Sequence, residues 1–194
     1  MYSRRIKKTD HTFGVSGRLY KSNVLIYDHQ TESLWSQLMD TAVSGPLAGT
    51  ALKKLPANRV RWDTWKKKYP DTRVLSTDTG YTRDYWRDPY TGYYLVGSLM
   101  FPVGDVRRDL PAKAQVLGIT VSGQSRAYPL EILEKHSGIL QDRLGDALIR
   151  IDIDAAGQVV DVVDSDGKPL VHLYAYWFAW QAFHPETTVY KQVN

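Results

Sequence analysis

The sequence contains no cysteine, and this absence excludes several kinds of chemistry at once. Without a thiol the chain can form no disulfide bond, offers no thiolate to a metal ion and has no cysteine nucleophile. The same absence leaves the cellular compartment undetermined.

Long apolar runs are missing as well. The longest apolar segment, residues 173–183, is shorter than the roughly 18 to 20 residues that a membrane-spanning helix needs, and Gln181 interrupts it. The basic residues 1–8 lead into polar sequence without an apolar stretch, which is not the pattern of a secretory signal. The sequence therefore predicts neither a membrane span nor a signal peptide.

Charge of one sign is in only slight excess, because 25 Lys and Arg residues against 21 Asp and Glu residues give a formal net charge of +4. The lysines at 66–68 lie beside an aromatic face, which is typical of a solvated surface, so nucleic-acid binding is not predicted. Neither the dinucleotide-binding glycine motif nor the Walker motif occurs, so no cofactor is predicted.

What is present is typical of a soluble globular protein, with 43% hydrophobic and 24% charged residues. We expect one domain over residues 1–194. A sub-boundary near residue 110 separates an aromatic-rich β part (1–110) from a β-helix-β part (111–194).

Short runs of β-favouring residues and alternating apolar positions predict most of the elements. Ile149, Ile151 and Ile153 alternate with polar residues, which is the pattern of a half-buried strand. Strands are expected within residues 13–19, 24–27, 33–37, 47–55, 74–75, 116–121, 125–128, 149–153, 159–163 and 170–173, the last two paired across an Asp-Gly turn.

Helices are expected at fewer places. Trp62, Trp65 and Tyr69 have helical spacing and predict a short helix with one buried aromatic face. Pro129 suits the start of a second helix, residues 174–183 could form a buried third one, and 78–92 has the composition of a structured loop. The expected fold is α+β and mainly β, with antiparallel strands in curved sheets or a partly open barrel.

Several motifs together resemble the family called domain of unknown function 3179 (DUF3179). The run Thr31-Glu32-Ser33-Leu34-Trp35-Ser36-Gln37 is the most specific of them. The others are Thr12-Phe13-Gly14-Val15-Ser16-Gly17, Thr79-Gly80, Asp88-Pro89-Tyr90, Arg126-Ala127-Tyr128-Pro129-Leu130 and Phe178-Ala179-Trp180-Gln181-Ala182-Phe183-His184-Pro185.

This resemblance implies a bacterial or archaeal protein without an established activity, often exported. The resemblance implies no catalytic mechanism. Longer members of the family carry an upstream Cys-Pro-x-Cys element that this chain lacks, so any thiol or metal chemistry of those members is not expected here.

The densest set of chemically useful side chains lies in residues 28–37. In one reading, alternation places Ser33, Trp35 and Gln37 on one strand face as an aromatic platform for a polar ligand. In the other, Asp28 stabilises the turn and Trp35 fills the core.

Two functions from different classes remain. The first is a binding module for a small polar ligand or a partner protein, with a pocket drawn from Asp28, His29, Ser33, Trp35, Gln37, Tyr85, Tyr90, Trp177, Trp180 and His184. The second is a hydrolase with Asp28 or His29 as general base, because histidine titrates near neutral pH.

Metal and carbohydrate-cleaving sites are not predicted. The five histidines show no ligand spacing, and the sequences at Asp152 and Asp164 lack the remaining ligands of a calcium loop. Asp84 and Asp88 could flank a glycan, but salt-bridged loop packing is the simpler account and the one we expect.

Overall fold

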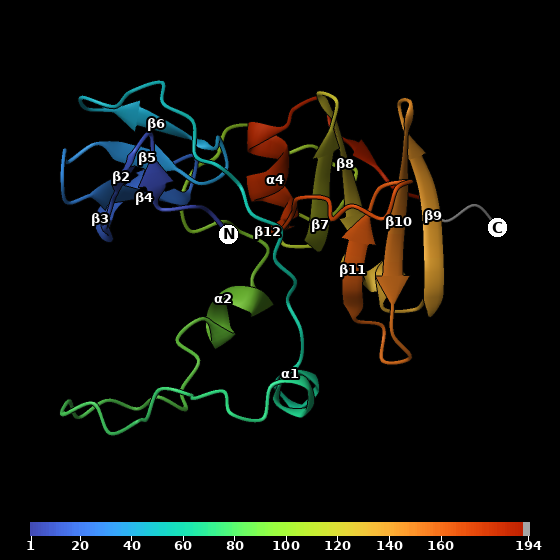
Figure 1. Ribbon diagram of the computed structural model, residues 1–194, viewed down its shortest axis with the longest axis horizontal. Helices are drawn as coiled ribbons and strands as arrows, with labels where there is room; N and C mark the ends of the chain where they lie inside the picture. The colour runs from blue at the N-terminus through green and yellow to red at the C-terminus, as the bar shows by residue number, and fades with distance from the viewer. Residues whose placement is uncertain (192–194) are drawn as a thin grey trace.

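The computed structural model describes residues 1–191. Two lobes stand side by side, and a long excursion projects away from both of them (Figure 1). The N-terminal lobe is a small hairpin on an antiparallel sheet whose strands follow chain order. Its strands are β1 (Arg5–Ile6), β2 (Thr9–Asp10), β3 (Phe13–Tyr20), β4 (Asn23–Asp28), β5 (Leu34–Ser36) and β6 (Thr41–Ser44).

The C-terminal lobe holds two sheets. One has the order β12-β7-β8-β13, in which β13 runs parallel to β8, and the other has the order β11-β10-β9. Their strands are β7 (Gln115–Val121), β8 (Gln124–Pro129), β9 (Gly138–Leu144), β10 (Ala147–Ile153), β11 (Val159–Val163), β12 (His172–Tyr176) and β13 (Thr188–Val189).

The two short helices of this lobe are α3 (Leu130–Leu133) and α4 (Trp177–Phe183), and α4 stands between the lobes. The fold is therefore α+β and mainly β, as expected, and its sheets stay open rather than closing into a barrel.

Each lobe has its own core. Trp35 is fully buried in the N-terminal lobe, where it packs with Ile6, Ala42 and Leu52. In the C-terminal lobe the isoleucines of β10 point inward at 0 to 4% exposure, which confirms the predicted alternation. At roughly 25 cal/mol per Å² of apolar surface, such burial is the main term that holds each sheet.

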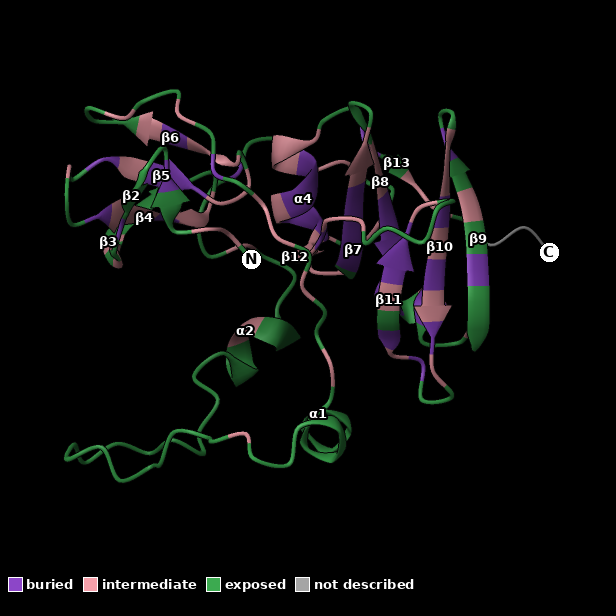
Figure 2. Cartoon of the chain, viewed as in Figure 1, coloured by how far each residue is buried: buried purple, intermediate pink, exposed green. Residues whose placement is uncertain are grey.

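Residues 56–102 form this excursion, which we call the arm. It carries α1 (Trp62–Lys68) and α2 (Thr91–Leu95), and none of its residues is buried (Figure 2). The predicted helix at Trp62 forms, but its aromatic face was expected to be buried and is exposed, because no sheet lies against it.

Three strand predictions were wrong. Residues 74–75 form no strand. Residues 47–55 contribute only isolated bridges, such as Thr41 to Ala51, because the amides of Ala48 and Thr50 are used in local turns. Residues 170–173 do not pair as a strand with β11 beyond Leu170, since β12 pairs with β7 instead.

Candidate functional site

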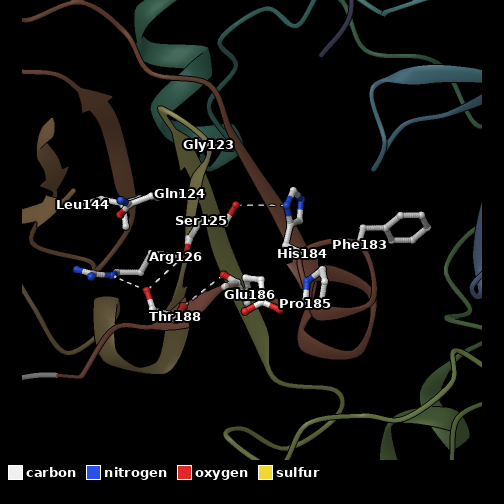
Figure 3. Close-up of a pocket in the computed structure, with 11 residues that line it drawn as sticks. Gly123, Gln124, Ser125, Arg126, Leu144, Phe183, His184, Pro185, Glu186 and Thr188 are labelled. Carbon is white, nitrogen blue, oxygen red and sulfur yellow. Dashed lines mark hydrogen bonds between the residues drawn. The ribbon is translucent and has the colours of Figure 1, made fainter. Parts of the chain in front are cut away.

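A cleft of about 410 Å³ opens where the β7–β8 hairpin meets the end of α4 (Figure 3). Its walls come from residues 123–126 of β8 and its turn, Leu144 of β9, and residues 183–188 between α4 and β13. The polar side chains that line it are those of Gln124, Ser125, Arg126, His184, Glu186, Thr187 and Thr188.

Ser125 and His184 face each other across the cleft. The Ser125 hydroxyl lies 3.3 Å from His184 Nδ1 and 2.8 Å from the Thr120 hydroxyl on the neighbouring strand. Ser125 pairs with Thr120 and lies on the same face of the hairpin as Gly118, the face against which Trp180 packs, so its hydroxyl points toward α4 and His184. The pair can therefore both donate to and accept from a ligand.

His184 is fixed by what lies beneath it. It follows the last residue of α4, its backbone N–H donates to the Trp180 carbonyl at 3.0 Å, and its ring stacks on Trp180 at 3.8 Å. Burial lowers the pKa of His184 and Lys54 lowers it further, whereas Asp40 raises it, and the net direction is down. The imidazole is thus neutral at pH 7 and keeps one acceptor nitrogen.

Trp180 supports the site from beneath: it is 1% exposed and stacks against His184, which lines the cleft. Its Nε1–H donates to the Thr187 hydroxyl at 2.9 Å, which ties α4 to the segment that enters β13. Gly118 on β7 is required for this packing, because a Cβ built there would lie 2.3 Å from the Trp180 ring. The glycine therefore sets the depth at which Trp180 and His184 sit.

Arg126 forms the side of the cleft next to β9. Its Nη1 donates to Asp142 at 2.5 Å and to the Arg143 carbonyl at 3.1 Å, and its Nε donates to the Thr188 hydroxyl at 3.0 Å. Tyr128 also donates to Asp142, at 2.7 Å. The guanidinium is held rigidly and its charge is balanced by Asp142.

The N-terminal lobe borders the same region. Lys21 Nζ donates to the Ala182 carbonyl at 2.7 Å, and the Tyr20 ring meets Phe183 edge-on at 5.7 Å. Asp40 and Lys54 form an ion pair at 2.6 Å, and both line a small cavity together with His184. Both lobes therefore contribute to the surroundings of the cleft.

The predicted cluster at residues 28–37 lies elsewhere, in the N-terminal lobe. Asp28 is fully buried and accepts hydrogen bonds from Trp35 Nε1 at 2.8 Å and from the Thr31 amide at 2.7 Å. Burial raises the pKa of Asp28, but the hydrogen bonds from Trp35, Thr31 and His11 outweigh it and hold the pKa below its usual value. This arrangement stabilises the turn, which was one of the two readings of the sequence.

The other predicted residues are spread over three places. Ser33 is buried, and its hydroxyl accepts from the Leu47 amide. Gln37 is half-buried, and its carbonyl accepts from the Tyr2 hydroxyl, whereas His29 is exposed beside Tyr27.

Tyr85 and Tyr90 lie on the arm. Trp177 is buried and donates to the Arg107 carbonyl. Of the predicted set, only His184 lines the cleft, with Trp180 stacked beneath it, and the roles of the others stay predictions.

Sequence reasoning missed Ser125, Arg126 and Thr188. The signal was present, because two of the motifs that carry the family resemblance, 126–130 and 178–185, border this cleft. Nothing in the neighbouring sequence indicated that these two motifs meet in the fold.

Among residues 1–191, no group of three or more His, Asp or Glu side chains is arranged to hold a metal ion. No helix in this part of the chain is long and apolar enough to cross a membrane.

A family model described as a protein of unknown function (DUF3179) matches residues 1–187. No curated protein and no solved structure matches the chain.

Proposed function

The chain belongs to the DUF3179 family of proteins of unknown function, and we propose that it is a binding module for a small, neutral, hydroxyl-bearing ligand held in the cleft. The observation that carries this proposal is the convergence of Ser125, His184, Arg126 and Thr188 on one cleft of about 410 Å³. Sites for small molecules commonly have volumes of roughly 300 to 1,000 Å³.

The chemistry of the lining favours a neutral ligand. Hydroxyls and a neutral imidazole both donate and accept, which matches the hydroxyl groups of a sugar or polyol. Arg126 does not favour an anion, because Asp142 already balances its charge at 2.5 Å. Phe183 and Pro185 add an apolar wall against which a ring can lie.

The cleft is also preorganised. Arg126, His184 and Trp180 are each held by hydrogen bonds or stacking before a ligand arrives. A site whose side chains are already fixed loses less conformational entropy on binding.

A panel of probes tests this proposal by thermal shift. The panel contains glucose, N-acetylglucosamine and myo-inositol as neutral probes, and phosphate and citrate as anionic probes. We expect stabilisation by a neutral member, and the Ser125→Ala variant should bind that member about 5- to 10-fold more weakly, the loss of one hydrogen bond of about 1 kcal/mol.

Ser165→Ala is the matched control, because this exposed hydroxyl lies in the turn after β11, outside the cleft. Stabilisation by the anions alone, or equal binding by both variants, would contradict the proposal.

A second candidate function is hydrolysis, and one observation supports it. The Ser125 hydroxyl lies 3.3 Å from His184 Nδ1, and the lowered pKa of His184 leaves that ring free to accept the serine proton at neutral pH. This pair replaces Asp28 and His29 as the proposed catalytic groups, since Asp28 is buried away from the cleft.

A fluorophosphonate probe separates the two functions. An activated serine would attack phosphorus, expel fluoride and pass its proton to His184. Labelling of the wild type that is lost in Ser125→Ala would favour the hydrolase, and an unlabelled chain that still binds a neutral probe would favour the binding module.

A further inference from the structure

The arm presents an unusual amount of apolar surface. Leu75 is 96% exposed and Trp86 is 91% exposed, and both lie in the segment between α1 and α2. Tyr81, Leu95 and Phe101 are exposed as well. A segment that exposes this many large apolar side chains is typical of a contact with another molecule.

The arm is nevertheless anchored at its base. Asn58 donates to the Val160 carbonyl at 2.7 Å, and Lys113 Nζ donates to the Tyr93 and Val96 carbonyls at 2.6 Å. Both ends are thus tied to the C-terminal lobe while the far end projects away from both lobes (Figure 1). The arm is therefore an extension whose two ends are fixed on the C-terminal lobe by hydrogen bonds.

The N-terminal lobe has an apolar groove of about 590 Å³ on its sheet. Leu19, Tyr20 and Met39 line it and are exposed, and Leu25 and Leu34 lie deeper between them. Within residues 1–191, no hydrogen bond or aromatic contact joins the arm to the groove. One chain therefore has an exposed apolar projection and an exposed apolar groove that do not cover each other.

We propose that the protein forms a two-fold symmetric dimer in which the arm of each copy occupies the groove of the other. A second copy is the occupant because this chain itself supplies both surfaces, and a reciprocal exchange covers both with a single repeated contact. Such an exchange closes on itself and forms no open filament.

The large side chains that the arm exposes can supply the area that a stable dimer needs. A stable interface buries about 800 Å² on each partner. One aromatic side chain contributes about 150 to 250 Å² when buried, and the arm exposes several. Because the exchange occurs twice in a symmetric dimer, each chain buries both an arm and a groove.

Because the chain contains no cysteine, a single introduced cysteine is the only thiol that a cross-linker can label. One variant carries Thr82→Cys on the arm, a second carries Met39→Cys in the groove, and the two are mixed and treated with a short bismaleimide. We expect arm-to-groove links to exceed arm-to-arm and groove-to-groove links well beyond the random two-to-one-to-one ratio. A random ratio, or links within one variant only, would overturn the proposal.

Light scattering provides the second measurement. The wild type should have twice the 22.1 kDa mass of the chain at micromolar concentration. The double variant Leu75→Ser/Trp86→Ser should be a monomer that is still folded, because neither residue belongs to a core. Ile139→Ser is the matched control, since it replaces an exposed apolar residue on β9, and it should remain a dimer.

A monomeric wild type at 100 µM, including one that binds a different protein through the arm, would overturn the exchange. A dimer that survives the double variant would overturn it as well.

Discussion

Replacement of Asp28 by Asn should destabilise the N-terminal lobe strongly without altering the cleft. The carboxylate is fully buried and accepts from Trp35 Nε1, the Thr31 amide and the Thr31 hydroxyl. An asparagine of the same shape has one acceptor oxygen and turns an NH₂ group toward these donors.

The magnitude follows from the hydrogen bonds that are lost. Hydrogen bonds to a charged group contribute about 1.5 to 3 kcal/mol each, and the substitution weakens about two of them. We therefore expect a loss of roughly 3 kcal/mol in the free energy of unfolding, about a hundredfold or more in the unfolding constant.

Urea unfolding followed by tryptophan fluorescence measures this loss, and its pH dependence checks the cause. Because the folded-state pKa of Asp28 is lowered, the stabilisation is fully present above the unfolded pKa of about 3.9 and is lost as the pH falls through the folded value. The difference between wild type and variant should be constant from pH 7 to 5 and narrow below about pH 4. A loss below about 1 kcal/mol at pH 7, or a difference that grows in acid, would refute the reasoning.

Two further predictions concern the cleft. Gly118→Ala should displace the Trp180 ring, since the added Cβ would lie 2.3 Å from it; we expect a loss of roughly 2 to 3 kcal/mol in denaturant unfolding and a changed near-UV circular dichroism spectrum, and an unchanged spectrum would contradict this. His184→Gln should remove part of the pH dependence of the free energy of unfolding. Because burial lowers the folded-state pKa of His184, the stability that the neutral imidazole contributes is present above the unfolded pKa of about 6.5 and is lost as the pH falls toward the folded pKa. Wild-type stability should therefore decline below about pH 6.5 more steeply than that of the variant, and parallel curves would count against it.

Local patterns in the sequence predicted the regular parts of the fold. Ile149 to Ile153 alternate because one face of β10 is buried, and the turn before Gln124 joins two β-favouring runs, so neighbouring residues alone determine both features. Trp62 and Trp65 show the limit of the same reasoning. Helical spacing predicts an aromatic face, but it does not say whether another element covers that face.

The candidate site was predicted only in part for a similar reason. His184 and Trp180 are four residues apart on and after α4, so they could be recognised together. Ser125 joins them only because β13 pairs in parallel with β8 over a separation of 62 residues, which no local pattern encodes. Asp28 was a candidate because its side chain is chemically versatile, although turn formation was enough to explain it.

The most direct test of the proposed cleft follows the tryptophan indole resonances in an NMR titration with the neutral probe that gives the largest thermal shift. The Nε1–H of Trp180 donates to Thr187, which lines the cleft, whereas Trp35 lies in the core of the N-terminal lobe and Trp86 on the arm. We predict a saturable shift of the Trp180 resonance, with those of Trp35 and Trp86 unmoved. A saturable shift at Trp86 or Trp35 with Trp180 unmoved would contradict a ligand site in the cleft.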